Sequence, residues 1–166
     1  MAAKIVGGET DACTVSAYGY NPALMSTSPF TGAIYSIVTS VAKVVAAGAG
    51  MDDIRLTLQE FFMRLRDDKK RWGVPLSALL GALYAQINLG LAAIGGKDSM
   101  SGSFEDIDVP PTLISFAIAP AKASKLITNV PERAGEKLWL LPMKKDAAFI
   151  PDFTYLKKLY AAVHSG

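Results

Sequence analysis

The chain has little cysteine, little histidine and little net charge. Of its 166 residues one is cysteine (Cys13) and one is histidine (His164), and 17 basic against 15 acidic residues leave a formal net charge of +2. A single cysteine excludes an internal disulfide framework and indicates a reducing compartment, so the expected location is the cytoplasm. The near-neutral balance argues against a nucleic-acid-binding protein, because such proteins carry a basic stripe.

The sequence also lacks a segment of signal-peptide type and a long uninterrupted apolar run. The N-terminus does not combine a basic stretch with an apolar stretch and small residues. The most apolar stretch, residues 33–51, is interrupted by Ser36, Thr39, Ser40 and Lys43, so we expect no membrane partner. The hydrophobic share of 51% is high for such a chain, and it predicts an apolar face that is buried against a partner.

Two long helices stand out from the periodicity. Ser28-Pro29 is an N-cap followed by proline at the first helical position, and apolar residues then recur at helical spacing until Gly48. The second helix opens at Gly73 and Pro75 and ends at Gly90. Its apolar stripe, which predicts a core-facing side, consists of Leu76, Leu79, Leu80, Leu83, Tyr84 and Ile87.

Short strands are predicted around these helices. They cover residues 4–7, 13–18, 54–58, 92–94 and 112–119, and a short charged helix is predicted over residues 59–71. The order predicts an α/β (or α+β) fold with helices on one face of the sheet. The first strand has no obvious pairing partner, so we expect the chain to start within a domain.

A composition break divides the chain. We expect a first domain over residues 1–120, a linker over 121–135 and the start of a second domain over 136–166. The last part holds a predicted strand at residues 138–141 and a helix that Asp152 would cap. One strand and one helix cannot bury a core alone, so they either begin a second domain or pack back onto the first.

Residues 95–103 read Gly-Gly-Lys-Asp-Ser-Met-Ser-Gly-Ser, and these residue types are suited to binding an anion. Glycine lets the backbone approach a ligand, serine hydroxyls and free N–H groups can wrap an anion, and Lys97 adds a positive charge. A Walker-type phosphate loop is excluded: its first glycine would fall at Leu91, Asp98 stands where Ser or Thr should hold magnesium, and no helix start follows.

Residues 91–102 resemble the Gly-Lys-Asp-Ser-(Met/Leu)-Ser segment of the phosphoribosylformylglycinamidine synthases. Further resemblance to the large single-chain form of these enzymes lies, in the same order, at residues 18–22, 28–35, 80–86 and 104–112. Together the resemblance covers roughly residues 11–120 and points to the second synthetase half. It implies an N-terminal domain of the aminoimidazole-ribonucleotide-synthetase type, with a mixed sheet and helices on one face.

The resemblance also implies a function. Such an enzyme is an ATP-dependent ligase of purine biosynthesis that converts formylglycinamide ribonucleotide, glutamine and ATP to the formylglycinamidine, glutamate, ADP and phosphate. Its partners would be substrate, nucleotide, the other half of the same chain and a glutamine amidotransferase (glutaminase) domain. The piece alone is expected to be inactive and to self-associate, and we assign no catalytic residue; neither Cys13 nor His164 fits a glutaminase triad. The alternative is a non-catalytic scaffold half that only completes the synthetase barrel.

By the same resemblance, nucleotide or substrate would be bound by Gly95, Gly96, Lys97, Asp98, Ser99, Ser101 and Lys43. Gly96 matches a glycine that faces ATP, Lys97 an asparagine that holds magnesium, and Ser99 a serine that touches substrate. An ammonium cannot ligate a cation. The intact enzyme uses Mg²⁺, but Lys97, with Thr39 and Lys43 at two further metal-ligand positions, predicts phosphate binding without metal here. Glu105, Asp106 and Asp108 could coordinate magnesium but are more typical of a solvated loop.

Overall fold

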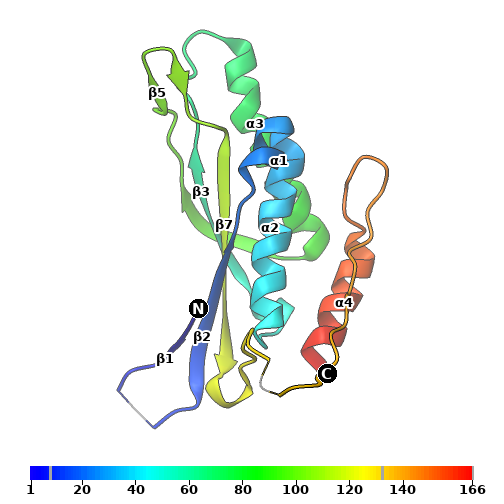
Figure 1. Cartoon of the computed structure of the whole chain (residues 1–166). Helices are drawn as coiled ribbons and strands as arrows, with labels where there is room; N and C mark the ends of the chain where they lie inside the picture. Colours follow the sequence, from blue (N-terminus) through cyan, green and yellow to red (C-terminus); the bar gives the residue numbers. More distant parts are fainter. Residues whose placement is uncertain (8, 132, 166) are drawn as a thin grey trace.

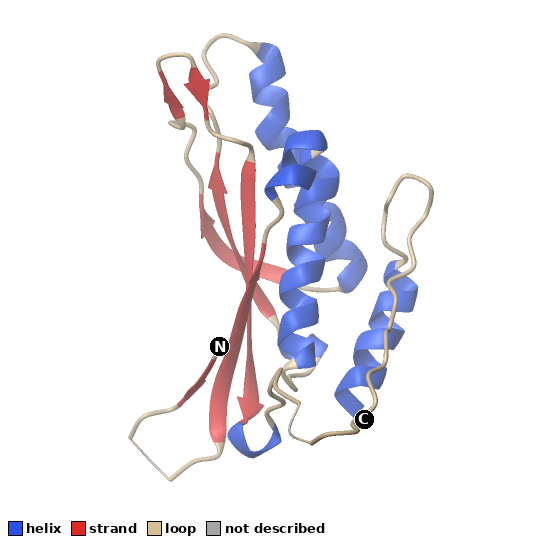
Figure 2. Ribbon diagram, viewed as in Figure 1, coloured by secondary structure: helices blue, strands red, loops and turns tan. Residues whose placement is uncertain are grey.

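The computed structural model describes residues 1–7, 9–131 and 133–165, so Glu132 of the expected linker and Gly166 of the expected second domain lie outside it. A five-stranded sheet in the order β1-β2-β7-β3-β4 forms one layer, and the helices gather on one side of it (Figures 1 and 2). Only β3 and β4 pair in parallel. The predicted mixed sheet with helices on one face is confirmed. The strands are β1 (Ala2–Lys4), β2 (Ala12–Gly19), β3 (Arg55–Phe61), β4 (Ala92–Lys97) and β7 (Thr112–Lys122), with β5 (Ser103–Phe104) and β6 (Ile107–Asp108) forming a separate hairpin.

The central helix is α2 (Pro29–Ala46), which packs on β2 and β7 and is itself covered by other helices. It begins where predicted, since the Ser28 hydroxyl accepts the backbone N–H of Thr31. Within the described residues it is the one helix long and apolar enough to span a membrane, but ten of its 18 residues are buried inside the protein. The other helices are α1 (Pro22–Thr27), α3 (Lys69–Leu89), α4 (Phe153–Ser165) and the short 3-10 turns η1 (Met51–Asp53) and η2 (Ala123–Lys125).

Backbone contact holds α2 to the sheet. A Cβ on Gly19 of β2 would lie 2.0 Å from the carbonyl oxygen of Ser36, so only glycine fits there. The Ser36 hydroxyl donates to the Leu113 carbonyl at 2.8 Å, and the hydroxyls of Ser40 and Ser115 lie 2.9 Å apart. These buried serines satisfy polar groups that would otherwise be left unpaired.

The helix α3 presents the opposite face to the one predicted. Its buried residues are mostly small: Pro75, Ala78, Gly81, Ala82, Ala85 and Leu89. A Cβ on Gly81 would lie 2.1 Å from the Phe30 carbonyl oxygen, so α2 and α3 touch through their backbones. Large side chains do not fit in that interface, and the leucine stripe is left exposed, with Leu76 at 57% and Ile87 at 70%.

Other boundaries also differ from the prediction. There is no helix over residues 59–68, because β3 continues to Phe61 along β7 and α3 starts only after its cap, Asp68. The first strand is β1, which does have a partner because it pairs with β2. β4 runs on to Lys97, beyond the predicted end at residue 94, and it is an exposed edge strand.

The C-terminal part packs back onto the first helices. Tyr160 of α4 is buried and its hydroxyl donates to the Val38 carbonyl at 3.3 Å, and the Phe153 ring meets the Tyr84 ring edge-on at 5.8 Å. Burial raises the pKa of Tyr160 to about 12. Residues 138–141 form no strand, since no described strand lies beside them, and Leu138 is 91% exposed.

The backbone contact between α2 and α3 predicts that alanine substitutions at two glycines of α3 have opposite effects on stability. Gly81→Ala should lower the free energy of unfolding by about 1–3 kcal/mol, because the new methyl group meets backbone that cannot move aside. Gly73→Ala is the matched control: a Cβ there meets nothing within 4 Å, so it should stabilise by up to about 1 kcal/mol. Urea unfolding of both variants measures the difference, and equal stabilities would contradict the packing.

Candidate functional site

The glycine segment (residues 95–103) is the end of an edge strand and the turn that follows it. Gly95, Gly96 and Lys97 pair with β3, opposite Thr57, Leu58 and Gln59 respectively. A Cβ on Gly96 would lie 2.5 Å from the Leu58 carbonyl oxygen, so the absence of a side chain here allows β4 to pair closely with β3. A Cβ on Gly95 would meet nothing within 4 Å.

Main-chain hydrogen bonds extend the pairing beyond Lys97. The N–H of Ser99 donates to the Glu60 carbonyl at 3.1 Å, and the N–H of Phe62 donates to the Ser99 carbonyl at 2.8 Å. This is the parallel-ladder pattern, and it places Asp98 beside Glu60. The N–H of Gly102 donates to the Phe62 carbonyl at 2.9 Å. The segment is therefore fixed to the end of β3.

The segment has two chemically different sides. Because successive side chains of a strand point to opposite faces, Lys97 and Ser99 lie on the open face of the sheet, away from α2. Asp98 lies on the helix-facing side. The hydroxyls of Ser99 and Ser101 are 2.8 Å apart. Lys97, Ser99 and Ser101 can together bind an anion, since an ammonium and two hydroxyls all donate hydrogen bonds.

Glu60 is a further residue of this region that was not predicted from the sequence. Its side chain is only 5% exposed, and its Oε2 has no hydrogen-bond partner among the described residues. Burial, and then the nearby charge of Asp98, raise the pKa of Glu60 to about 7. The alternation Ile54, Leu56, Leu58 reaches Glu60 two residues later, so a carboxylate at a core-facing position was the available signal.

Lys43 lies at the other edge of the sheet. Its Nζ donates to the Tyr18 carbonyl at 2.9 Å and sits 4.8 Å from the centre of the Tyr18 ring. The register from Tyr18 through Phe116 and Thr57 to Gly95 crosses three strand spacings, or about 14 Å. The structure therefore brings six of the seven predicted site residues into one segment and leaves Lys43 apart from them. Thr39 and Lys43 are not suited to hold a magnesium ion, because an ammonium cannot ligate a cation and a hydroxyl brings no negative charge.

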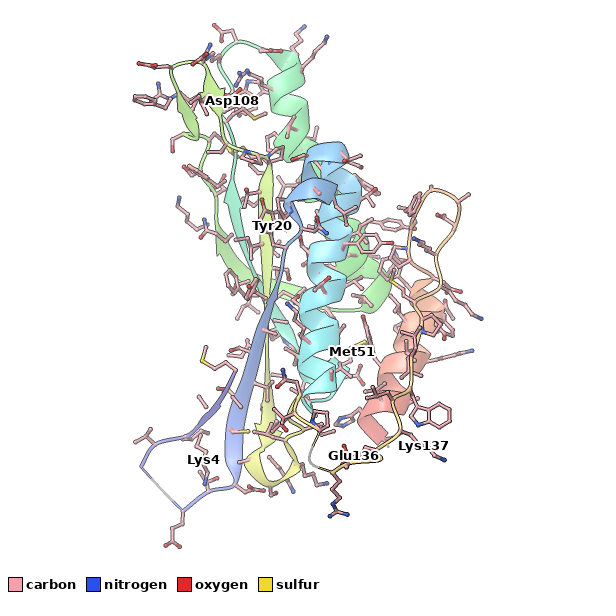
Figure 3. All side chains as sticks on the ribbon, viewed as in Figure 1. Lys4, Tyr20, Met51, Asp108, Glu136 and Lys137 are labelled. Carbon is pink, nitrogen blue, oxygen red and sulfur yellow. The ribbon has the colours of Figure 1, made fainter. Side chains whose placement is uncertain are left out.

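Of the acidic residues in the β5–β6 hairpin, one forms an ion pair and two are exposed to solvent. Asp108 forms an ion pair with Arg71 of α3 and accepts the Ser103 hydroxyl, so that the hairpin is tied to the start of α3 (Figure 3). The hydrogen bond from Arg71 is the main reason that the pKa of Asp108 is lowered. Glu105 and Asp106 are exposed. Within residues 1–7, 9–131 and 133–165, three or more His, Cys, Asp or Glu residues nowhere gather in a group that could hold a metal.

A hollow of about 630 Å³ lies elsewhere, between the α1–α2 junction and residues 145–149. The Tyr35 hydroxyl closes one side by donating to the Phe149 carbonyl at 2.9 Å. The lining of this hollow is mostly apolar and includes none of the predicted site residues. The glycine segment is therefore not part of this hollow.

Comparison with known proteins supports the fold. No protein-family model and no curated protein matches the sequence. Among solved structures, phosphoribosylformylglycinamidine synthase II from Thermotoga maritima superposes with a TM-score of 0.68 at 18% identity, over 95% of this chain and 24% of that chain. T. maritima PurL complexed with AMPPCP superposes with a TM-score of 0.71 at 15% identity, over 95% of this chain and 25% of that chain. PurLQS from the same organism superposes with a TM-score of 0.64 at 19% identity, over 92% of this chain and 24% of that chain.

The chain thus has the fold of a part of phosphoribosylformylglycinamidine synthase II and spans about a quarter of the length of the chains it matches. The fold implied by the sequence resemblance, an aminoimidazole-ribonucleotide-synthetase-like α/β fold, is confirmed.

Glu60 makes the stability of the chain depend on pH. Its pKa is about 7 in the folded state against an ordinary value of 4.5, so the folded state binds this proton more tightly. The free energy of unfolding should therefore fall as pH rises from about 4.5 to about 7, by up to about 3 kcal/mol.

Glu60→Gln should remove this loss, since a glutamine does not ionise. Urea unfolding at pH 5 and pH 8, with a chelator present, measures the effect. Glu136→Gln is the control, because Glu136 is exposed at the far end of the molecule from Asp108 (Figure 3). The same pH slope in Glu60→Gln and in the unsubstituted chain would contradict the assignment.

Proposed function

We propose that this chain is part of a phosphoribosylformylglycinamidine synthase and that its glycine segment binds a phosphate group of a nucleotide or ribonucleotide. The observation that carries the proposal is the position of the family-like Gly-Gly-Lys-Asp-Ser-Met-Ser run: it ends an edge strand, with Lys97, Ser99 and Ser101 on one accessible side. The PurL structures with this fold include complexes with ATP, AMPPCP and ADP.

Phosphate would be held here by side chains. The N–H groups of Ser99 and Gly102 are already used in bonds to β3 and the residue that follows it, so they are not free to form a backbone anion nest. The Lys97 ammonium neutralises the charge directly, and the two serine hydroxyls complete the contact. This is consistent with phosphate binding that needs no metal on the open face.

The reaction belongs to the complete enzyme. We infer a cytoplasmic ligase that makes formylglycinamidine ribonucleotide from formylglycinamide ribonucleotide, glutamine and ATP, with a glutaminase partner supplying ammonia. The chain covers about a quarter of its PurL relatives, and it is expected to be inactive alone. We also infer that residues 136–166 belong to a second domain of the complete enzyme, because the apolar side chains of residues 138–141 are left exposed even though α4 packs on α2 and α3.

A scaffold role is the second candidate, and the open face of the sheet favours it. In the described part of the chain no helix covers this face (Figure 2). Apolar side chains stand on it, with Tyr18 at 58%, Phe116 at 43% and Ile118 at 41% exposure. Such a face is suited to packing against a second sheet. In this role the chain would complete a barrel and hold no ligand.

Lys97→Ala separates the two candidates. If the glycine segment binds phosphate, the substitution should weaken ADP binding about tenfold or more, because a charge-assisted hydrogen bond contributes about 1.5–3 kcal/mol. Calorimetry on the complete synthase, with and without Mg²⁺, measures the dissociation constant for ADP. Lys43→Ala is the matched control at the opposite sheet edge and should leave the affinity unchanged. Unaltered ADP affinity in Lys97→Ala would favour the scaffold.

The open face also predicts self-association of the isolated chain. Sedimentation should show a species larger than a monomer, and Phe116→Lys should shift it to the monomer by placing a charge in the apolar face. Leu83→Lys is the control on the other exposed apolar surface, that of α3, where Leu83 is 51% exposed. A clean monomer for the unsubstituted chain, or dissociation by Leu83→Lys alone, would show that the sheet face is not the interface.

A further inference from the structure

Glu60 is the exception among the buried polar side chains. The others in the described core, Ser36, Ser40 and Ser115, all have hydrogen-bond partners. Glu60 is equally removed from solvent, at 5% exposure, yet its Oε2 has no partner among the described residues. Buried polar groups without a partner are rare in folded proteins, and a bound ion can satisfy such a group.

A second carboxylate stands next to it. Ser99 is bonded to both Glu60 and Phe62, so Asp98 is the neighbour of Glu60 across the parallel ladder and lies on the same side of the sheet. Neighbouring strands are about 4.8 Å apart, which is close enough for both carboxylates to contact one ion. Asp98 is exposed, so an ion can enter from solvent.

Neither carboxylate is ion-paired with a basic side chain, because the one ion pair among the described residues joins Arg71 to Asp108. Lys97 adjoins Asp98 in sequence, but the alternation of the strand directs it to the open face. Two neighbouring carboxylates without a counter-charge repel each other, so the ligand that relieves them is a cation.

We propose that Glu60 and Asp98 form a site for a hard divalent cation of the Mg²⁺ class at the helix-facing side of the β3–β4 edge. Mg²⁺ prefers carboxylate oxygens, keeps several waters and is commonly bound by only one or two carboxylates. The site is separate from Lys97, Ser99 and Ser101, which lie on the other side of the segment, and from Lys43. It does not depend on the proposed phosphate site.

Manganese is the probe, because free and bound Mn²⁺ are distinguished by electron paramagnetic resonance. Titration of the chain with MnCl₂ should show one saturable site from which MgCl₂ displaces Mn²⁺. Glu60→Gln and Asp98→Asn should each weaken binding at least tenfold. Glu136→Gln, which changes an exposed carboxylate elsewhere, should leave it unchanged.

Two results would overturn the site: no saturable Mn²⁺ binding at millimolar concentration, or binding that survives both carboxylate substitutions. Asp98 is exposed, so Asp98→Asn keeps the test decisive even if Glu60→Gln fails to fold. The outcome is distinguishable from the phosphate proposal. Loss of ADP affinity in Lys97→Ala without Mn²⁺ binding would remove this site alone, and Mn²⁺ binding with unaltered ADP affinity in Lys97→Ala would remove the phosphate proposal alone.

Discussion

Direct contact between backbones is the constraint on which this structure depends. At Gly19 the sheet touches α2, and at Gly81 α3 touches α2; in both places a methyl group would lie about 2 Å from a carbonyl oxygen. Elements this close leave no space for large side chains between them. The leucines of α3 are therefore directed outward, and the polar groups trapped at the contact must be satisfied by small hydroxyl side chains such as Ser36 and Ser40.

The same constraint acts at the edge of the sheet. Gly96 allows β4 to approach the Leu58 carbonyl, and the hydrogen bonds of Ser99 continue the ladder past the formal end of the strand. The residues proposed to bind ligands are thus held by strand pairing. The pairing also fixes their alternation, so that Lys97 and Ser99 share one face and Asp98 shares the other with Glu60. A flexible loop would not keep opposite charges apart in this way.

The order of elements and their best-marked ends could be predicted from the sequence. Ser28-Pro29 starts α2, and Gly90, with a positive φ of 76°, ends α3. Periodicity could not tell which apolar face of α3 is inside, because this depends on the small residues of a distant helix contact. The strand predicted at residues 138–141 was wrong, since a strand requires a partner. Six predicted site residues lie together because they belong to one short segment, whereas Lys43 was assigned by resemblance alone and lies at the other edge of the sheet.

Charge separation would let one short segment serve both the proposed phosphate site and the proposed cation site. An ammonium and a divalent cation compete for the same phosphate oxygens when they share a face. In this chain the alternation of one edge strand removes the competition: the ammonium lies with two hydroxyls on the open face, and the carboxylates of Glu60 and Asp98 lie behind it. In the proposed phosphate site Lys97 neutralises an anion on the open face, and the buried carboxylate of Glu60 still requires either a proton or a cation.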